Sequence, residues 1–114
     1  KAAGARLVLA DILLDQGRAT AAALGARFVP LDLGDPASCA ALAEDIAAQE
    51  GGLDGLVNNA AIATGIGGPE YDAIEIDTWD RVMRVNVRGT WLVTRACAPG
   101  AHRGCWPMWR RRAR

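Results

Sequence analysis

Residues 53–62 read "LDGLVNNAAI", and this stretch decides how the rest of the chain is interpreted. Leu56 and Val57 are a short apolar run typical of a buried strand, and Asn58 and Asn59 follow immediately. A buried amide needs hydrogen-bond partners, because leaving it unpaired costs free energy. Two adjacent amides at this place therefore indicate that they hold another part of the fold or a ligand.

The flanking segments alternate between short apolar runs and helical patterns. "ARLVLAD" (5–11) and "ARFVPLD" (26–32) predict buried parallel strands, and the proline in the second run indicates an edge strand or a strand end. An Ala-rich helix is expected over residues 15–25, closing at Gly25. With residues 53–59 as a further strand, this order predicts an α/β fold with a doubly wound parallel sheet.

Two more helices complete the pattern. Asp35 as N-cap and Pro36 at the first helical position predict a helix that ends at a Gly-Gly pair, 51–52. Its predicted apolar face consists of Cys39, Leu42, Ala43 and Ile46. A long helix is expected to be capped by Asp77 or Asp80 and stopped by Pro99. Its inward stripe is predicted to contain Val82, Val85, Asn86, Gly89, Leu92, Val93 and Ala96.

Length and composition indicate one soluble globular domain. The chain has 114 residues and a formal net charge of zero, and no apolar run is long enough to span a membrane. Without a signal-peptide pattern, a cytoplasmic location is expected. Cys39, Cys97 and Cys105 are an odd number without CxxC spacing, so we expect reduced thiols and neither a disulfide framework nor a metal site.

The zero net charge conceals an asymmetry. Residues 1–80 contain all thirteen acidic residues, whereas residues 81–114 contain nine arginines and no acid. The tail, residues 99–114, combines arginine with tryptophan, a pattern that can indicate a nucleic-acid or anionic surface. A solvated basic tail is the commoner explanation, and we expect neither a nucleic-acid nor a membrane partner.

Conspicuous polar residues follow the predicted strands, at the edge where such sheets bind ligands. In a dinucleotide-binding fold, an acid such as Asp11 at the tip of the second strand accepts both ribose hydroxyls and repels a 2′-phosphate, which favours NAD over NADP. The phosphate loop of such folds lies roughly 20 residues before this acid, so the first strand is expected upstream of Lys1. A helix N-cap or turn is the alternative role of Asp11.

Three segments together resemble the short-chain dehydrogenase/reductase family. "LVNNAAI" is similar to that family's N-N-A-G motif, with Ala61 in place of the final Gly. "PLDLGDPAS" resembles the segment after its third strand, and "RVNVRGTWLVTRA" resembles the helix that carries its catalytic Asn. The resemblance covers residues 1–98 and implies a partial Rossmann-like domain. That domain would lack the first strand and everything after the fourth strand and its helix.

The resemblance implies roles for individual residues in an NAD site. Asp11 would hold the adenosine ribose, and Asp32 with Leu33 would border the adenine. Asn59 would lie against the cofactor ribose, with Ala60 and Ala61 small enough to leave the cleft open. Asn58 would brace neighbouring strands.

Asn86 is the catalytic residue that the resemblance implies for this chain. It lies in the apolar stripe of the long helix, where the family's Asn kinks the helix and positions a water in a proton relay. The alternative from the residues alone is a buried Asn bonded to a neighbouring carbonyl.

The family's remaining chemistry is not encoded in this stretch. Hydride transfer between a nicotinamide and an alcohol or carbonyl uses a Tyr in a Y-x-x-x-K pair, together with a Ser. Tyr71 is followed four positions later by Glu75, and the only lysine is Lys1. His102 is not expected to substitute. We therefore expect an oxidoreductase by family whose chain alone is inactive; the alternative is a non-catalytic nucleotide-binding or associating remnant.

Two further expectations concern the centre of the sheet and the C-terminal tail. An empty central position in the sheet would leave ladder groups exposed and favour association with another chain, and the resemblance implies a homo-oligomer for the full-length form. Residues 99–114 contain no β-branched residue where the family enters a Val- and Ile-rich strand. A shifted reading frame would explain this break, and a DNA trace with an intact frame through codon 114 would exclude it.

Overall fold

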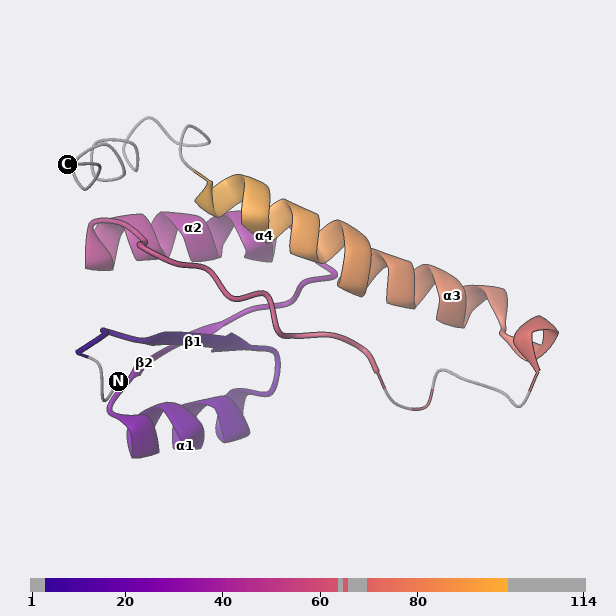
Figure 1. Cartoon of the computed structure of the whole chain (residues 1–114), viewed down its shortest axis with the longest axis horizontal. Coiled ribbons are helices and arrows are strands. Elements are labelled where there is room, and N and C mark those ends of the chain that lie inside the picture. Colours follow the sequence, from indigo (N-terminus) through magenta and orange to yellow (C-terminus); the bar gives the residue numbers. More distant parts are fainter. Residues whose placement is uncertain (1–3, 64, 66–69, 99–114) are drawn as a thin grey trace. The chain divides into compact units, whose positions relative to one another are not determined.

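The computed structural model describes residues 4–63, 65 and 70–98 (Figure 1). The chain forms two compact units, residues 1–32 and 33–114, which are described separately. The tail, residues 99–114, lies outside the described residues.

The first unit is a two-stranded parallel sheet with one helix. Strand β1 (Val8–Asp11) pairs with β2 (Arg27–Pro30), so that Val8 lies opposite Arg27 and Asp11 opposite Pro30. Helix α1 (Leu14–Leu24) connects the strands and packs on both. It ends at Gly25, whose φ of 57° is left-handed, as the sequence predicts.

A glycine allows α1 to approach the sheet closely. Gly17 faces the ring of Phe28 on β2, and a β-carbon at position 17 would lie 2.6 Å from Phe28 Cζ and 2.8 Å from Cδ2. Both distances are shorter than a carbon–carbon van der Waals contact. The size of residue 17 therefore sets the distance between α1 and β2.

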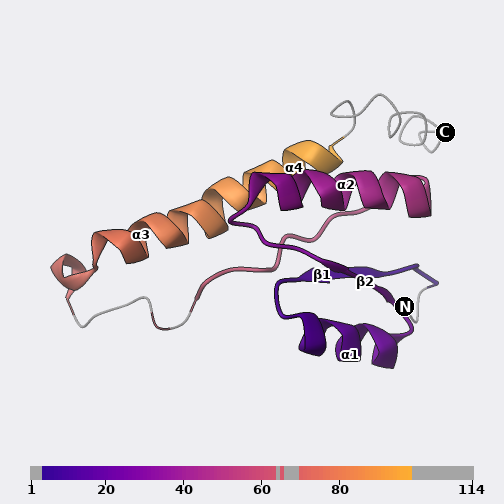
Figure 2. The same ribbon diagram turned by 180° about the vertical axis from the view of Figure 1, so that it is seen from behind.

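In the second unit, α2 (Pro36–Glu50) forms as the sequence predicts. The Asp35 side chain accepts a hydrogen bond from the Ala37 N–H at 2.9 Å, and Gly51 ends the helix with a φ of 74°. The whole predicted apolar face is buried: Cys39, Leu42, Ala43 and Ile46. Helix α2 packs against α4 (Thr90–Cys97), and the two lie side by side in Figures 1 and 2.

The long C-terminal helix consists of α3 (Ile76–Val82), the π-helical segment η2 (Met83–Gly89) and α4, preceded by the 3₁₀ turn η1 (Tyr71–Ala73). The predicted Asp caps are wrong: the helix begins after Glu75 without a side-chain cap. Asp77 and Asp80 lie within the first turns instead. The helix ends at Ala98, whose backbone is extended, as expected for a residue before proline.

The predicted inward stripe of this helix is confirmed. None of its seven residues is exposed, and Gly89 and Val93 are buried. The intervening positions carry the exposed side chains, which include Met83, Val87 and Trp91.

The predicted strand over residues 53–59 is wrong. This segment has no regular secondary structure, and Leu56 and Val57, expected to be buried, are 38% and 87% exposed. The physical reason is the lack of a neighbour, since β1 and β2 pair only with each other among the described residues. A strand needs an adjacent strand to complete its ladder hydrogen bonds.

The architecture is α/β, a partial Rossmann-like fold whose described residues form a parallel sheet of two strands. Within the described part of the chain, no helix is long and apolar enough to cross a membrane. Cys39 is buried and Cys97 half-buried, both as free thiols, and Cys105 lies outside the described residues.

Candidate functional site

Asn86 holds the backbone of Ile62 with both ends of its amide. Its Oδ1 accepts a hydrogen bond from the Ile62 N–H at 2.8 Å, and its Nδ2 donates to the Ile62 carbonyl at 2.9 Å. This pairing resembles one rung of a β-ladder, with a side-chain amide in place of a strand. The alternative derived from the residues, a buried Asn bonded to a neighbouring carbonyl, therefore describes the bonding of this side chain correctly, but the side chain is only partly buried.

The helix leaves α geometry around this residue. Asn86 lies at the centre of the π-helical segment η2 (Met83–Gly89). A π-helical turn replaces the i→i−4 hydrogen bond with an i→i−5 bond, and such turns occur frequently at functional sites. Asn86 thus combines a side chain engaged by Ile62 with a backbone in a non-standard helical turn.

Asn58 makes a second contact between residues 58–62 and the long helix. Its Nδ2 donates to Thr94 Oγ1 on α4 at 2.9 Å, and Thr94 Oγ1 in turn donates to the Thr90 carbonyl at 2.8 Å. The prediction that Asn58 braces neighbouring strands differs from this arrangement, because its partner is a helix threonine. The hydroxyl can serve both contacts, since it is a donor and an acceptor at once.

The two contacts are about equally far apart along the segment and along the helix. Four residues separate Asn58 from Ile62, about 13 Å of extended chain. Eight residues separate Asn86 from Thr94, about 12 Å of helix. The segment therefore runs antiparallel to the helix between its two attachment points.

The residues between these attachment points are presented outward. Asn59, Ala60 and Ala61 are all exposed, and the Asn59 side chain hydrogen-bonds to none of the described residues. The predicted cofactor residues of this segment therefore form a short exposed row with a fixed backbone. A fixed row of small side chains beside one uncommitted amide is suited to a ligand that lies along the chain.

The turn after β2 is held by the same helix. Leu33 is buried, and its carbonyl is 4.0 Å from the Cys39 sulfur. Arg88 Nη2 donates to the Gly34 carbonyl at 3.3 Å, and Gly89 lies directly against Leu33. Residues 33 and 34 are thereby fixed from both α2 and η2.

In the first unit, Asp11 and Asp32 lie at the same end of the sheet. Asp11 is the last residue of β1, and Asp32 comes two residues after its partner strand ends at Pro30. Asp11 Oδ1 accepts from the Leu13 N–H at 2.9 Å, so the predicted turn role is observed. Its other carboxylate oxygen has no hydrogen-bond partner among the described residues.

Sequence reasoning missed the partners that fix the site. Ile62 acts through its backbone, and no side-chain pattern could have identified it. Thr94 and Arg88 are ordinary polar residues on an exposed helix flank, where solvation is the usual role. The only available signal for Thr94 was its position eight residues, a little over two turns, after Asn86.

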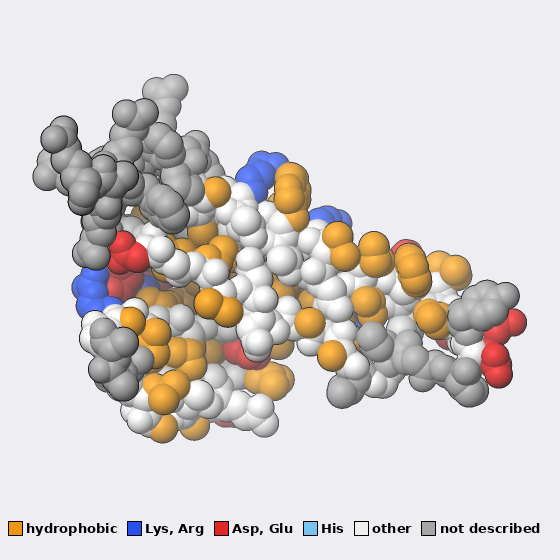
Figure 3. Space-filling view, viewed as in Figure 1, with side chains coloured by type: hydrophobic (Ala, Val, Ile, Leu, Met, Phe, Trp, Pro, Cys, Tyr) orange, Lys and Arg blue, Asp and Glu red, His pale blue; other side chains and the backbone are white. Residues whose placement is uncertain are grey.

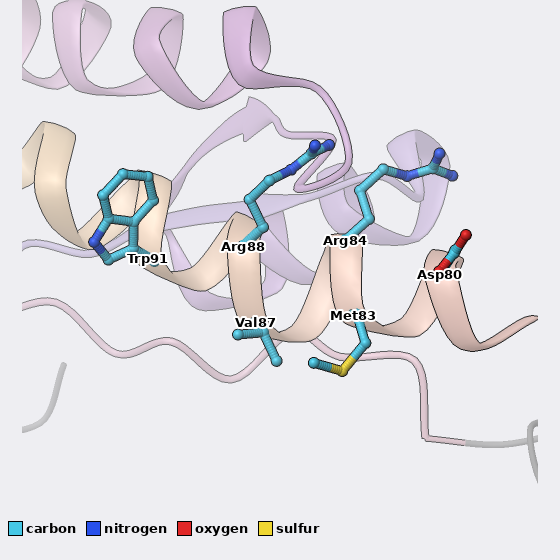
Figure 4. Close-up of a pocket in the computed structure, with 6 residues that line it drawn as sticks. All are labelled: Asp80, Met83, Arg84, Val87, Arg88 and Trp91. Carbon is cyan, nitrogen blue, oxygen red and sulfur yellow. The ribbon is translucent and has the colours of Figure 1, made fainter.

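A second surface runs along the outer side of the long helix. A hollow of about 650 Å³ is lined by Asp80, Met83, Arg84, Val87, Arg88 and Trp91, all from the same helix (Figure 4). Hydrophobic side chains gather along this helix in Figure 3. The hollow is a groove on a helix surface, and it lacks the enclosing walls of a cofactor pocket.

Comparison with known proteins identifies the family to which the chain belongs. A family model described as enoyl-(acyl carrier protein) reductase matches residues 1–105. A 3-alpha-(or 20-beta)-hydroxysteroid dehydrogenase of Mycobacterium bovis (strain ATCC BAA-935 / AF2122/97) is 42% identical over 97 residues. This chain belongs to the short-chain dehydrogenase/reductase family. The match covers 83% of the chain but 36% of the mycobacterial protein, so this short-chain dehydrogenase/reductase chain spans about a third of that relative's length.

Solved structures agree with this family assignment. A 3-ketoacyl-(acyl-carrier-protein) reductase from Brucella melitensis, complexed with NADH, is 33% identical with a TM-score of 0.76, covering 82% of this chain and 39% of that one. A gluconate 5-dehydrogenase from Burkholderia cenocepacia J2315, in complex with NADP and tartrate, is 31% identical with a TM-score of 0.73. That match covers 84% of this chain and 38% of the other. Relatives of this short-chain dehydrogenase/reductase thus carry either nicotinamide cofactor.

No metal centre accompanies these features in the part of the chain that the structure describes, where no three His, Cys, Asp or Glu side chains gather closely enough to hold an ion. The conspicuous polar groups are carboxylates in the first unit, and amides and backbone groups in the second. Such groups recognise ribose hydroxyls and nitrogen bases by hydrogen bonding.

Proposed function

We propose that this chain supplies part of the cofactor site of a nicotinamide-dependent oxidoreductase that acts on a small alcohol or carbonyl substrate. The observation that carries the proposal is the double hydrogen bond between Asn86 and Ile62, because it fixes the backbone of the exposed residues Asn59, Ala60 and Ala61. When bound, the nicotinamide would accept or donate the hydride. The residues of this chain would bind and orient it.

Each proposed cofactor residue has the chemistry that its role requires. The unpaired oxygen of Asp11 can accept from a ribose hydroxyl, and the exposed Asp32 carboxylate, beside Leu33, can accept from an adenine amino group. Asn59 offers an uncommitted amide to the second ribose. Because the Asp11 charge repels a 2′-phosphate, we propose NAD as the preferred cofactor, although solved relatives hold NADH or NADP.

Asn86 is proposed as the relay residue of the family's proton path. Its side chain is occupied by Ile62, so the part left to hold a water is its backbone carbonyl within the π-helical segment. The Tyr, Lys and Ser that the family uses for the proton transfer are not in this chain in the required pattern. We therefore propose that the 114 residues alone bind cofactor without turning it over.

A fluorescence titration of the chain with NADH and NADPH tests this function. Binding without turnover, tighter for NADH, supports the proposal, and Asp11→Ser should reduce the difference between the two cofactors. Absence of binding to a folded chain supports the alternative, a non-catalytic remnant of the family. Thr20→Ser, on an exposed position of α1 away from the strand ends, is the matched control for Asp11→Ser.

The whole protein is proposed to be a cytoplasmic homo-oligomer. The helix α3–η2–α4 exposes large apolar side chains on one flank, namely Ile76, Trp79, Met83, Val87 and Trp91. A contiguous apolar surface of this kind is commonly covered by protein. Sedimentation of the wild type beside Trp91→Glu tests this, with dissociation expected for the variant.

A further inference from the structure

We propose that Arg88 is a positioning residue for the adenine end of the cofactor, acting through the turn at Leu33 and Gly34. This inference rests on the proposed function, which assigns Asp32 and Leu33 to the adenine.

The guanidinium makes a specific contact with the turn. Arg88 Nη2 donates to the Gly34 carbonyl at 3.3 Å, across 54 residues of sequence. A charged donor strengthens a hydrogen bond to a carbonyl, although 3.3 Å is long for such a bond. The turn and the long helix are thereby connected at the residue that follows Leu33.

The next residue of the helix provides independent support. Gly89 is buried against Leu33, and a β-carbon there would lie 2.7 Å from Leu33 Cβ and 2.9 Å from the Leu33 carbonyl carbon. Its φ is −62°, so glycine is required for space and not for an unusual backbone. Arg88 and Gly89 therefore hold consecutive residues of one turn, the first by a hydrogen bond and the second by close contact.

Arg84 shows that this contact is particular to Arg88. Both arginines are exposed, one helical turn apart, and their side chains extend in the same direction from the helix in Figure 4. Arg84 hydrogen-bonds to none of the described residues, whereas Arg88 reaches Gly34. The pair therefore offers a charge-matched control on the same helix.

The experiment compares the binding of two ligands, each of which represents one half of the cofactor. Calorimetry measures how the full chain binds ADP-ribose, which contains the adenine, and reduced nicotinamide mononucleotide, which does not. For Arg88→Ala we expect the Kd for ADP-ribose to rise about fivefold, the scale of one long charge-assisted hydrogen bond, with no change for the mononucleotide. Arg88→Lys should recover most of the affinity, and Arg84→Ala should match the wild type.

Other outcomes would overturn the proposal. Equal losses in Arg84→Ala and Arg88→Ala would indicate a general attraction between positive charge and the diphosphate. Unchanged ADP-ribose binding in Arg88→Ala would show that adenine binding does not depend on Arg88, whatever the result for Gly89→Ala. A wild-type chain that is folded but binds no ADP-ribose would reject the proposed function.

Amide hydrogen exchange tests Arg88 even without a ligand. Faster exchange around residues 33–35 is expected in Arg88→Ala and not in Arg84→Ala. Equal exchange in the two variants would show that Arg88 does not hold the turn. Should Arg88→Ala fail to fold, Arg88→Lys and Arg88→Gln provide the same comparison with smaller changes.

Discussion

The amide of Asn86 pairs with both backbone polar groups of Ile62, at 2.8 and 2.9 Å, and so replaces a neighbouring strand for that residue. Together with the hydrogen bond between Asn58 and Thr94, this pairing orders a segment that forms no ladder with β1 or β2. The fixed backbone conformation of the predicted cofactor residues Asn59, Ala60 and Ala61 therefore depends on Asn86, which lies 24 positions after Ile62 in the sequence.

Asn86→Asp is expected to destabilise the second unit by about 1–2 kcal/mol, because it replaces the donor that faces the Ile62 carbonyl with an acceptor. Urea unfolding measures the loss, and hydrogen exchange of the Ile62 amide locates it. Asn59→Asp, at an exposed amide without a partner, is the control and should stay within about 0.5 kcal/mol of the wild type. Equal effects at the two positions would contradict the pairing.

Asn58 and Thr94 should be energetically coupled. Thr94→Val keeps the shape of the side chain and removes its hydroxyl, and Asn58→Ala removes the donor. A double-mutant cycle is expected to give a coupling of about 0.5–1 kcal/mol, in the range for a hydrogen bond near the surface. Additive losses would show that the two residues act independently.

Asp35→Ala should destabilise α2 by about 1 kcal/mol, because the Ala37 N–H loses its capping acceptor. Asp35→Ser retains a capping oxygen and should be almost neutral. The urea midpoint measures both, with exposed Glu44→Ala in the middle of the same helix as the control. A larger loss from Glu44→Ala than from Asp35→Ala would refute the cap.

Gly17→Ala tests the close approach between α1 and β2. Alanine normally stabilises a helix interior relative to glycine by about 1 kcal/mol. Here the added methyl would overlap the Phe28 ring, so a net loss of about 1–3 kcal/mol is expected. Phe28→Leu should relieve part of that loss, and Gly55→Ala, with open space around it, should be close to neutral.

Local features of the chain could be predicted because they depend on near neighbours. The Asp35 cap and the left-handed glycines at 25 and 51 follow from the chemistry of single positions. The inward stripe that contains Asn86, Gly89 and Val93 follows from helical periodicity. These features are decided within a few residues along the chain.

The strand expected at residues 53–59 shows where such reasoning fails. Its apolar pattern is that of a strand, but a strand exists only beside another one. Ladder partners come from distant sequence, and no pattern within "LDGLVNN" reports whether they are present. The cap predicted at Asp77 or Asp80 was wrong because the helix begins before both residues, at Ile76.

The sequence by itself determined the family, the first two strands with the helices that follow them, and the residue types proposed to meet a nicotinamide cofactor. Only the tertiary structure decided which groups hold those residues: Asn86 for Ile62, Thr94 for Asn58, and Arg88 for Gly34. The physical reason is that hydrogen bonds between segments 24 to 54 residues apart depend on how helices and loops pack. Helix propensity and apolar periodicity, by contrast, act over a few residues and can be read directly from the chain.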